Sequence, residues 1–335
     1  MKEARFYEKK EDNAVQCLLC PHHCLLKLGQ TGICHVRKNE KGTLYALSYG
    51  QLVAKNPDPI EKKPLFHFHP GSRSYSIATV GCNLQCKHCQ NADISQATPN
   101  EIFSEDTSPE DVVQAAKKTG CKSIAYTYTE PTIFYEYAYD TAKLAHDQGL
   151  KNVFVTNGFI ENEPLEEIAS YLDAANIDLK SMSETFYRKI CGAHLQPVLD
   201  RIQDYHDLGI WIELTTLLIP GYNDSKKELI DIARFIADID AEIPWHVTGF
   251  YPTYKLTDAK ATTVSALEQA AKIGMDQGLQ YVYQGNLGSG EDTVCPSCGK
   301  TLISRRVFYV ANNVIKDSTC PYCGKKIKGI GMDGI

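Results

Sequence analysis

The chain has no long hydrophobic run and no excess of positive charge. None of its segments reaches the roughly 18 consecutive apolar residues from which a membrane-spanning helix is built, so we expect no membrane span. The opening residues, MKEARFYEKK, are charged throughout and lack the apolar segment of a secretion signal, which predicts a cytoplasmic protein. The formal net charge of -6 argues against nucleic acid as the main partner, because binding to phosphates needs a basic surface.

Cysteine, by contrast, is plentiful. The 335 residues are 43% hydrophobic and 23% charged, and this length and composition suit one large α/β unit that carries smaller modules. Eleven of the 13 cysteines fall into three compact clusters with the spacing of metal ligands rather than of disulfide partners. The other two, Cys121 and Cys191, are predicted to be small buried residues or inert thiols.

The most informative cluster consists of Cys82, Cys86 and Cys89. It lies in the run TVGCNLQCKHCQN, directly after the strand-like residues 76–80. Iron in a four-iron cluster normally takes four thiolates, so three leave one iron open to another ligand. An open coordination position is where chemistry takes place, as at catalytic zinc. The alternative is a three-cysteine zinc site that is completed by His88 or by a distant residue.

Residues 74–284 alternate between short apolar runs and amphipathic stretches, at intervals of roughly thirty residues. The predicted strands are residues 74–80, 123–128, 152–156, 174–179, 211–218, 246–250 and 281–283. The predicted helices are residues 109–118, 133–146, 163–171, 198–206, 225–239 and 264–277. About six strand–helix units predict an α/β fold, a partial (β/α)6 parallel barrel over residues 71–288, whose ligand site lies at the carboxyl ends of the strands.

Residues 1–70 are expected to form a small cysteine-rich module and a linker. The cysteines of this module are Cys17, Cys20, Cys24 and Cys34. Four thiolates could hold structural zinc or an auxiliary iron–sulfur cluster. Zinc is slightly favoured, because three neighbouring histidines offer extra ligands and no second cysteine group completes a two-cluster ferredoxin pattern. The proline-containing stretch that follows is predicted to be an extended connection along the barrel surface.

Residues 289–335 carry two knuckles, CPSCGK and CPYCGK. Their cysteines are Cys295, Cys298, Cys320 and Cys323. Paired knuckles of this kind resemble a zinc ribbon, in which four soft ligands in two tight turns suit tetrahedral zinc. A rubredoxin-like single iron and a role in holding a partner are the alternatives. Residues 295–329 contain seven Lys or Arg and one acid, an excess of six that four thiolates on one zinc lower to four, so an acidic protein partner is a further hypothesis.

The spacing C-x3-C-x2-C directly after a strand resembles the signature loop of the radical S-adenosylmethionine (SAM) enzymes. The resemblance implies a [4Fe-4S] cluster whose open iron is bound by the amino and carboxylate groups of SAM. It also implies that an electron from the cluster splits the sulfonium of SAM to give a 5'-deoxyadenosyl radical, which abstracts a hydrogen atom.

Holding SAM against such a cluster requires groups for its charged ends and its ribose. The stretch TYTEPT is similar to the turn that holds the SAM amino group in these enzymes, although only its Glu-Pro pair, at Glu130, matches. Asn157 in TNG and Asp178 and Lys180 in DLK resemble stretches of the activases of glycyl-radical enzymes. The resemblance implies ribose contacts from Asn157 and Asp178 and a contact from Lys180 to the SAM carboxylate. His246 takes the place of a histidine that contacts SAM in those activases.

From end to end, the chain resembles the radical SAM family of the AmmeMemoRadiSam system, whose relatives include the activases of pyruvate formate-lyase. The resemblance implies Ammecr-type and Memo-type companion proteins, and we expect a reduced ferredoxin or flavodoxin as the electron donor. Three functions stay open. The first is a radical SAM enzyme that acts on a small substrate, for instance an aromatic one, or on a partner protein. The second is an activase that installs a glycyl radical, and the third is a metal-binding scaffold or electron carrier that does not cleave SAM.

Overall fold

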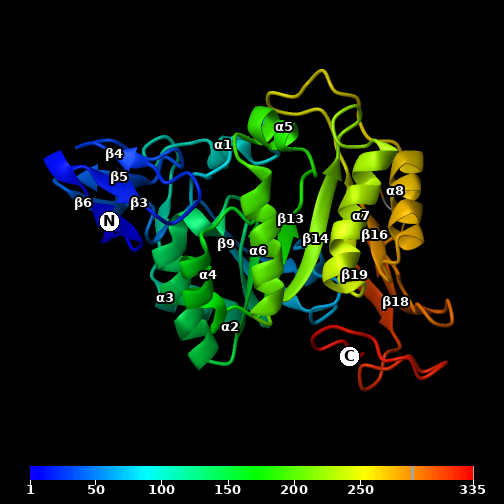
Figure 1. Ribbon diagram of the computed structural model, residues 1–335. Helices are drawn as coiled ribbons and strands as arrows, with labels where there is room; N and C mark the ends of the chain where they lie inside the picture. The colour runs from blue at the N-terminus through cyan, green and yellow to red at the C-terminus, as the bar shows by residue number, and fades with distance from the viewer. Residues whose placement is uncertain (288–289, 335) are drawn as a thin grey trace.

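A sheet of eight strands forms the centre of the molecule (Figure 1). The structure, a computed structural model, describes residues 1–287 and 290–334. Seven strands run parallel in the order β9-β11-β12-β13-β14-β15-β16, and β8 pairs antiparallel with β9 at one edge. The strands are β8 Ala54–Pro59, β9 Arg73–Ala78, β11 Ser123–Tyr126, β12 Lys151–Thr156, β13 Ala174–Asp178, β14 Trp211–Leu218, β15 Trp245–Gly249 and β16 Val282–Gly285. The prediction of an α/β fold with a parallel sheet is confirmed.

Helices follow the strands and cover one face of the sheet (Figure 1). The longer ones are α2 Pro109–Lys118, α3 Tyr135–Asp147, α4 Asn162–Ala169, α6 Leu195–Asp207, α7 Lys226–Asp240 and α8 Val264–Asp276. Helix α2 begins with a capping box, in which the side chains of Ser108 and Asp111 each accept the other's backbone N–H. At the starts of α7 and α8, the side chains of Ser225 and Thr263 likewise accept a backbone N–H from the first turn of the helix. These local signals place the helix starts close to where the sequence predicts them.

Successive residues of each strand face opposite sides of the sheet. On β11, Ile124 packs into the large core beneath the helices, whereas Ala125 belongs to a smaller apolar cluster on the other, inner face. Val153 and Ala174 from the neighbouring strands join Ala125 there, and residues from the segment 60–68 complete the cluster. The inner face of the sheet is therefore filled by chain that precedes the barrel in sequence.

The segment before the barrel differs from its prediction. Residues Ala54–Pro59 form the edge strand β8, and the following residues enter the inner face, where Leu65 and Phe68 are fully buried. The carboxylate of Glu213, on β14, accepts hydrogen bonds from the backbone N–H groups of Phe66 and His67 at 2.9 and 2.7 Å. The prediction of an extended connection along the barrel surface is wrong for this segment, because it carries buried apolar side chains that the inner face of the sheet needs.

Two small sheets, β1-β6-β5 and β2-β3-β4, form the N-terminal module. Their strands are β1 Lys2–Glu3, β2 Tyr7–Lys9, β3 Val15–Cys17, β4 Leu25–Leu26, β5 Arg37–Glu40 and β6 Thr43–Ala46. Arg37 is buried and donates to both carboxylate oxygens of Glu136, on α3, at 3.0 Å. Its other terminal nitrogen donates to the carbonyl of Arg5 at 2.6 Å. A charge-assisted pair therefore attaches this module to the outer helices.

The C-terminal module, which we call the ribbon, is built on the sheet of β17 Thr293–Val294, β18 Thr301–Arg306 and β19 Tyr309–Asn313. Arg305 is buried and donates to the carbonyl of Phe66 at 2.9 Å and to Thr293 Oγ1 at 2.8 Å. Its guanidinium lies 4.3 Å from the centre of the Phe66 ring and 3.6 Å from the carboxylate of Glu61. The ribbon is thus attached to the same segment that fills the inner face of the barrel.

The last residues of the ribbon return to the barrel. Phe68 forms a bridge with Ile330, and His67 Nδ1 donates to the carbonyl of Lys328 at 2.7 Å. The boundary predicted between barrel and ribbon, at residues 288 and 289, lies outside the described residues. No helix in the part of the chain that the structure describes combines the length and apolar character that crossing a membrane requires.

Candidate metal and cofactor sites

The radical loop, residues 82–89, follows β9 at the carboxyl edge of the sheet. Gly81 precedes it with a φ of +95°, and a Cβ there would lie 2.5 Å from the carbonyl oxygen of Cys34. Only glycine fits such a close approach at a positive φ. The radical loop with Cys82, Cys86 and Cys89 is therefore packed directly against the N-terminal module.

A second contact holds the radical loop through its backbone. The backbone N–H groups of Gln85 and Lys87 donate to the carbonyls of Cys191 and Ile190 at 2.8 and 2.9 Å. Both acceptors belong to the π-helical turn Tyr187–Cys191, which follows β13 and the short helix α5 Glu184–Phe186. Cys191, one of the two isolated cysteines of the sequence, is fully buried in this turn. The prediction that Cys191 is buried is confirmed. Its backbone carbonyl also helps to hold the radical loop.

Two of the loop sulfurs lie beside polar side-chain or backbone donors. Cys82 Sγ accepts from the backbone N–H of Leu84 at 3.4 Å and lies 3.8 Å from the donor Asn157 Nδ2. Cys89 Sγ lies 3.3 Å from Ser95 Oγ. Hydrogen bonds to thiolate sulfur are among the contacts that tune iron–sulfur centres. The surroundings of both sulfurs therefore suit thiolates that ligate iron.

Cys86 lies next to the thiol of Cys191. A hydrogen bond from Cys191 lowers the pKa of Cys86, and the charge of Lys180 lowers it further, although burial opposes both. The same hydrogen bond and burial raise the pKa of Cys191 well above its usual value. Of the two thiols, Cys86 therefore loses its proton more readily, and the thiolate is the form that binds metal.

The loop thiols and His88 do not converge on a single ion. Among the described residues, only the ribbon cysteines form a set of three or more ligand atoms that all lie within 4.8 Å of one another. His88 is buried against Phe186, with ring centroids 6.0 Å apart, and burial lowers its pKa to about 3. The wider separation of the loop thiols suits a multi-iron cluster better than a zinc ion with His88 as fourth ligand.

Glu130 lies just beyond β11, and its carboxylate is fully engaged. It accepts from Thr132 N and Oγ1 at 3.0 and 2.7 Å, from Thr156 Oγ1 at 2.8 Å and from Asn157 N at 2.8 Å. Burial raises its pKa, while these hydrogen bonds oppose the rise. Glu130 therefore joins the ends of β11 and β12, and both of its buried carboxylate oxygens accept hydrogen bonds from the protein.

Asn157, at the end of β12, bridges the strand to the radical loop. Its Nδ2 donates to Asn83 Oδ1 at 2.8 Å, and its Oδ1 accepts from the backbone N–H of Phe159 at 2.9 Å. Because Nδ2 also lies beside Cys82 Sγ, the amide is placed at the cluster site that the sequence predicts.

Lys180 and Asp178 form an ion pair at the end of β13, with Nζ 2.7 Å from the carboxylate. The side chain of Lys180 is 14% exposed and that of Asp178 is 38% exposed, so a ligand could reach the carboxylate. Burial would lower the pKa of Lys180, but Asp178 and Cys86 together raise it well above its usual value. The structure therefore holds a permanent cation beside the radical loop.

His246 lies deeper, on the inner face of the sheet. It is 3% exposed, its Nε2 lies 2.7 Å from Glu213, and its ring stacks on Tyr283 and meets Phe66 edge-on. Burial tends to raise the pKa of Glu213, but the hydrogen bond and charge of His246 lower it overall. Glu213 is not among the site residues predicted from the sequence. The available signal was an acid in the middle of an apolar strand, which needs a buried partner.

A second missed group lies at the end of β11. Tyr128 has a φ of +65°, its hydroxyl donates to Asp58, and its carbonyl accepts from Asn91 Nδ2 at 2.8 Å. Lys63 Nζ lies 2.9 Å from Asp58 and 4.4 Å from the centre of the Tyr128 ring. Burial lowers the pKa of Lys63 to about 8. Asp58 and Lys63, from the segment before the barrel, therefore meet Tyr128 from beyond β11 and place a buried cation near Asn91, just after the radical loop. No local motif in the sequence predicts this contact.

The ribbon cysteines have the geometry of a site for one metal ion. The sulfurs of Cys295 and Cys323 are 3.6 Å apart, and those of Cys298 and Cys320 are 3.8 Å apart. Four sulfurs at about 2.3 Å from a tetrahedral metal lie about 3.8 Å from one another. The ribbon could therefore bind a metal ion without rearrangement.

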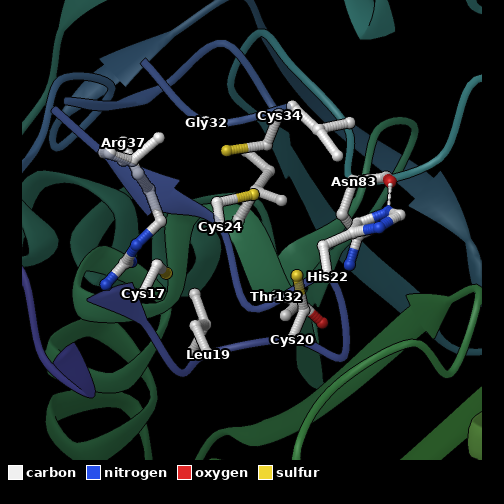
Figure 2. A pocket seen from close by; sticks show the side chains of 13 residues that line it. Cys17, Leu19, Cys20, His22, Cys24, Gly32, Cys34, Arg37, Asn83 and Thr132 are labelled. Atoms are coloured by element: carbon white, nitrogen blue, oxygen red, sulfur yellow. Dashed lines mark hydrogen bonds between the residues drawn. The ribbon is translucent and has the colours of Figure 1, made fainter. Parts of the chain in front are cut away.

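The cysteines of the N-terminal module, Cys17, Cys20, Cys24 and Cys34, are brought together around a cavity (Figure 2). Arg37 and Asn83 also line it. Asn83 belongs to the radical loop, so the cavity touches the candidate cluster site.

Comparisons with known proteins agree with this arrangement. The radical SAM superfamily model matches residues 76–236, which include the radical loop. An uncharacterized protein of Methanocaldococcus jannaschii is 47% identical over 311 residues, 92% of either chain. The pyruvate formate-lyase-activating enzyme of Clostridium pasteurianum is 22% identical over 227 residues, 64% of this chain and 93% of its own. SuiB of Streptococcus suis, solved with S-adenosylmethionine bound, shares the fold with a TM-score of 0.51 at 14% identity, over 68% of this chain and 53% of SuiB. The chain therefore belongs to the radical SAM superfamily, and this membership implies a [4Fe-4S] cluster and SAM.

Proposed function

We propose that this protein is a radical SAM enzyme whose [4Fe-4S] cluster is held by Cys82, Cys86 and Cys89, with one iron left for SAM. The observation that carries the proposal is the placement of three thiols on one loop at the carboxyl edge of the sheet, spaced too widely for a single ion. With cluster and SAM bound, the site supplies a 5'-deoxyadenosyl radical that abstracts a hydrogen atom from the substrate.

The residues at the strand ends divide the binding of SAM among them. Lys180, held by Asp178, offers its charge to the SAM carboxylate, and the exposed part of Asp178 offers an acceptor to a ribose hydroxyl. Asn157 lies beside Cys82 and can reach the ribose from the other side. Glu130 acts as a positioning residue, because its oxygens are occupied, and the backbone carbonyls beside it take the SAM ammonium. His246 supports the inner wall through Glu213.

We place the reaction in the AmmeMemoRadiSam system, with Ammecr-type and Memo-type companion proteins and a reduced ferredoxin or flavodoxin as the electron donor. The substrate is a small molecule, for instance an aromatic one, or a partner protein. The cysteine modules at residues 1–70 and 289–335, which lie outside the matched residues 76–236, support a role beyond that of a minimal activase.

An activase of a glycyl-radical enzyme is the second candidate. It is supported by the similarity to the activating enzyme of Clostridium pasteurianum and by the Asp178–Lys180 pair. A glycyl radical that appears on a partner protein in electron paramagnetic resonance (EPR) spectra would favour this candidate over the first.

We also propose that the ribbon holds structural zinc and offers a modest basic surface. Arg305 is buried, and Lys325 and Lys328 pair with Glu242 and Asp240. Five cations of the ribbon are exposed, Lys300, Arg306, Lys316, Lys326 and Lys328, and Lys328 is the one among them that pairs with Asp240. An acidic partner would therefore bind through fewer charges than the sequence suggests, and its binding should weaken with salt.

The test of the enzyme proposal is SAM cleavage. Protein reconstituted with iron and sulfide without oxygen is given dithionite and SAM, and 5'-deoxyadenosine is measured. Cys82→Ala should reduce its formation to background, whereas Cys121→Ala, which alters a buried thiol outside the clusters, should leave it unchanged. Wild-type protein that binds iron but forms no 5'-deoxyadenosine would contradict the enzyme proposal. The metal-binding scaffold would then be the remaining function.

Lys180→Met tests the SAM contact. Loss of a charge-assisted hydrogen bond should weaken SAM binding by about 10- to 100-fold while the iron content stays the same. Lys189→Met is the matched control, because Lys189 is an exposed lysine of the neighbouring turn. Equal SAM affinity of both variants would remove Lys180 from the binding site.

A further inference from the structure

The four N-terminal cysteines surround a cavity rather than a point. All four line it, together with Arg37 and Asn83 (Figure 2). Since the ribbon alone, within residues 1–287 and 290–334, brings three or more ligand atoms within 4.8 Å of one another, the N-terminal sulfurs lie farther apart. Thiolates on a single tetrahedral metal are about 3.8 Å apart, whereas those on the corners of a four-iron cube are separated by roughly 6 Å.

The histidines beside these cysteines are engaged in other contacts. His22 Nε2 lies 2.7 Å from the carbonyl of Asn83, to which it donates, and His23 Nε2 lies 2.8 Å from the carboxylate of Glu161. The sequence analysis favoured zinc partly because such histidines could act as ligands. Each histidine keeps a second ring nitrogen, but within the described residues neither joins two of these cysteines in a set of ligand atoms that lie within 4.8 Å of one another. That reason for zinc therefore loses its weight.

Arg37 brings an unused donor to the cavity wall. The residue is 2% exposed, and its two terminal nitrogens donate to Glu136 and to the carbonyl of Arg5. Its Nε has no hydrogen-bond partner within the described residues. A buried N–H without an acceptor costs free energy, and the sulfur of a cluster in this cavity would accept it. The guanidinium would also offset the negative charge of four thiolates.

The cavity adjoins the radical loop. Asn83 lines it, and Asn157 Nδ2 links Asn83 to Cys82 Sγ, with distances of 2.8 and 3.8 Å. The carbonyl of Cys34 lies so close to Gly81 that no side chain fits between them. A centre in the cavity and a centre on the radical loop would therefore be neighbours without an intervening layer of protein.

We infer that Cys17, Cys20, Cys24 and Cys34 bind a second [4Fe-4S] cluster, ligated by four thiolates, that exchanges single electrons with the cluster on the radical loop. The inference rests on the proposed function only for the identity of its electron acceptor. One electron from an external low-potential donor reduces the second cluster, and transfer of that electron to the radical loop returns it to its oxidised state. No bond forms or breaks in this exchange, and the electron count balances.

Metal analysis of a variant without the radical site tests the inference. In Cys82→Ala/Cys86→Ala/Cys89→Ala, reconstituted without oxygen, about four irons and about four sulfides per chain should remain. The EPR signal of the reduced variant should not change when SAM is added, because all four irons carry thiolates. A variant that holds no iron and about two zinc ions per chain, or a single iron without sulfide, would overturn the inference. Failure of the wild type to cleave SAM would leave this result unaffected.

The reverse variant tests the proximity of the two clusters. Cys20→Ala/Cys24→Ala should lose about half of the iron and keep only a signal that changes with SAM. In the reduced wild type, magnetic coupling should broaden both EPR signals, and the broadening should vanish in either variant. A wild-type spectrum equal to the sum of the two variant spectra would contradict the proximity. An unchanged ribbon zinc content serves as the folding control, and if the reverse variant does not fold, the first variant decides alone.

Discussion

The two four-cysteine modules of this chain differ in how they arrange the same number of thiols. In the ribbon, all four sulfurs lie within 4.8 Å of one another, and Cys298 and Cys323 are exposed. In the N-terminal module, Cys17 and Cys34 are buried, and the sulfurs line the wall of a cavity that touches the radical loop. The same number of cysteines therefore builds two different kinds of site, which differ in the separation of the sulfurs and in their neighbours.

Each module is also attached by a buried arginine, but to a different layer of the barrel. Arg37 reaches Glu136 on the outer helix α3, whereas Arg305 reaches the segment 61–66 on the inner face of the sheet. The N-terminal module thus lies next to the reactive edge, and the ribbon supports the inner packing. Three changes should separate the two modules experimentally.

The largest effect is expected from removing a ribbon ligand. Cys320→Ser should abolish zinc binding at the ribbon, which removes binding free energy on the order of 10 kcal/mol and unfolds the module. Zinc content should fall by about one ion per chain, and residues 293–334 should become sensitive to protease, while the iron content stays constant. Ser297→Ala, on the same knuckle but not a ligand, is the control. A drop in iron alongside zinc would show that the two modules are not independent.

Breaking the ion pair between Arg37 and Glu136, which attaches the N-terminal module, should have an intermediate effect on stability. Arg37→Met leaves the carboxylate of Glu136 buried and unpaired, which should lower the free energy of unfolding by about 3–5 kcal/mol. Hydrogen exchange should speed up in residues 1–46 and not in the ribbon. Arg37→Met/Glu136→Leu removes both charges and should recover much of the loss. Faster exchange in the ribbon instead would show that the modules are coupled through the barrel.

The smallest effect is expected from lowering the pH, through protonation of His67, which contacts the ribbon. Burial lowers the pKa of His67 to about 4, below the value of about 6.5 in an unfolded chain. As the pH falls below 6.5, the unfolded chain gains a proton that the folded protein excludes, so stability is lost. Between pH 6.5 and pH 5 the loss should be about 2 kcal/mol.

Urea unfolding of the wild type and of His67→Gln at both pH values measures this contribution. The variant should show the weaker pH dependence, because glutamine does not titrate. Equal pH dependence of the two proteins would mean that other groups, such as the ribbon thiols, control the acid response.

The sequence predicts the barrel well because each strand and helix carries its own local signal. The helix caps at Ser108, Ser225 and Thr263 and the apolar runs of the parallel strands need no knowledge of distant residues. Strand β8 carries the opposite signal, since Pro57 and Pro59 are typical of turns. The structure accepts them because β8 is an edge strand, where a missing N–H is tolerated.

The candidate site likewise has one part that the sequence predicts and another that it does not. The cysteine motif and its position after a strand can be read from consecutive residues. The pairs Glu213–His246 and Cys86–Cys191, and the contact of Lys63 with Tyr128, join residues that lie on separate elements. Their coupling depends on strand register and on side-chain packing, for which no short stretch of sequence contains the information.

The hydrogen bond between His67 and Lys328 joins positions 261 residues apart. Closing so long a loop is opposed by chain entropy, and contacts of this range slow folding. We therefore expect the inner floor of the barrel, on the side away from α1 Ala92–Ser95 and α5 (Figure 1), to be completed late in folding. If the ribbon holds the proposed zinc, supply of that metal becomes a checkpoint for finishing the barrel.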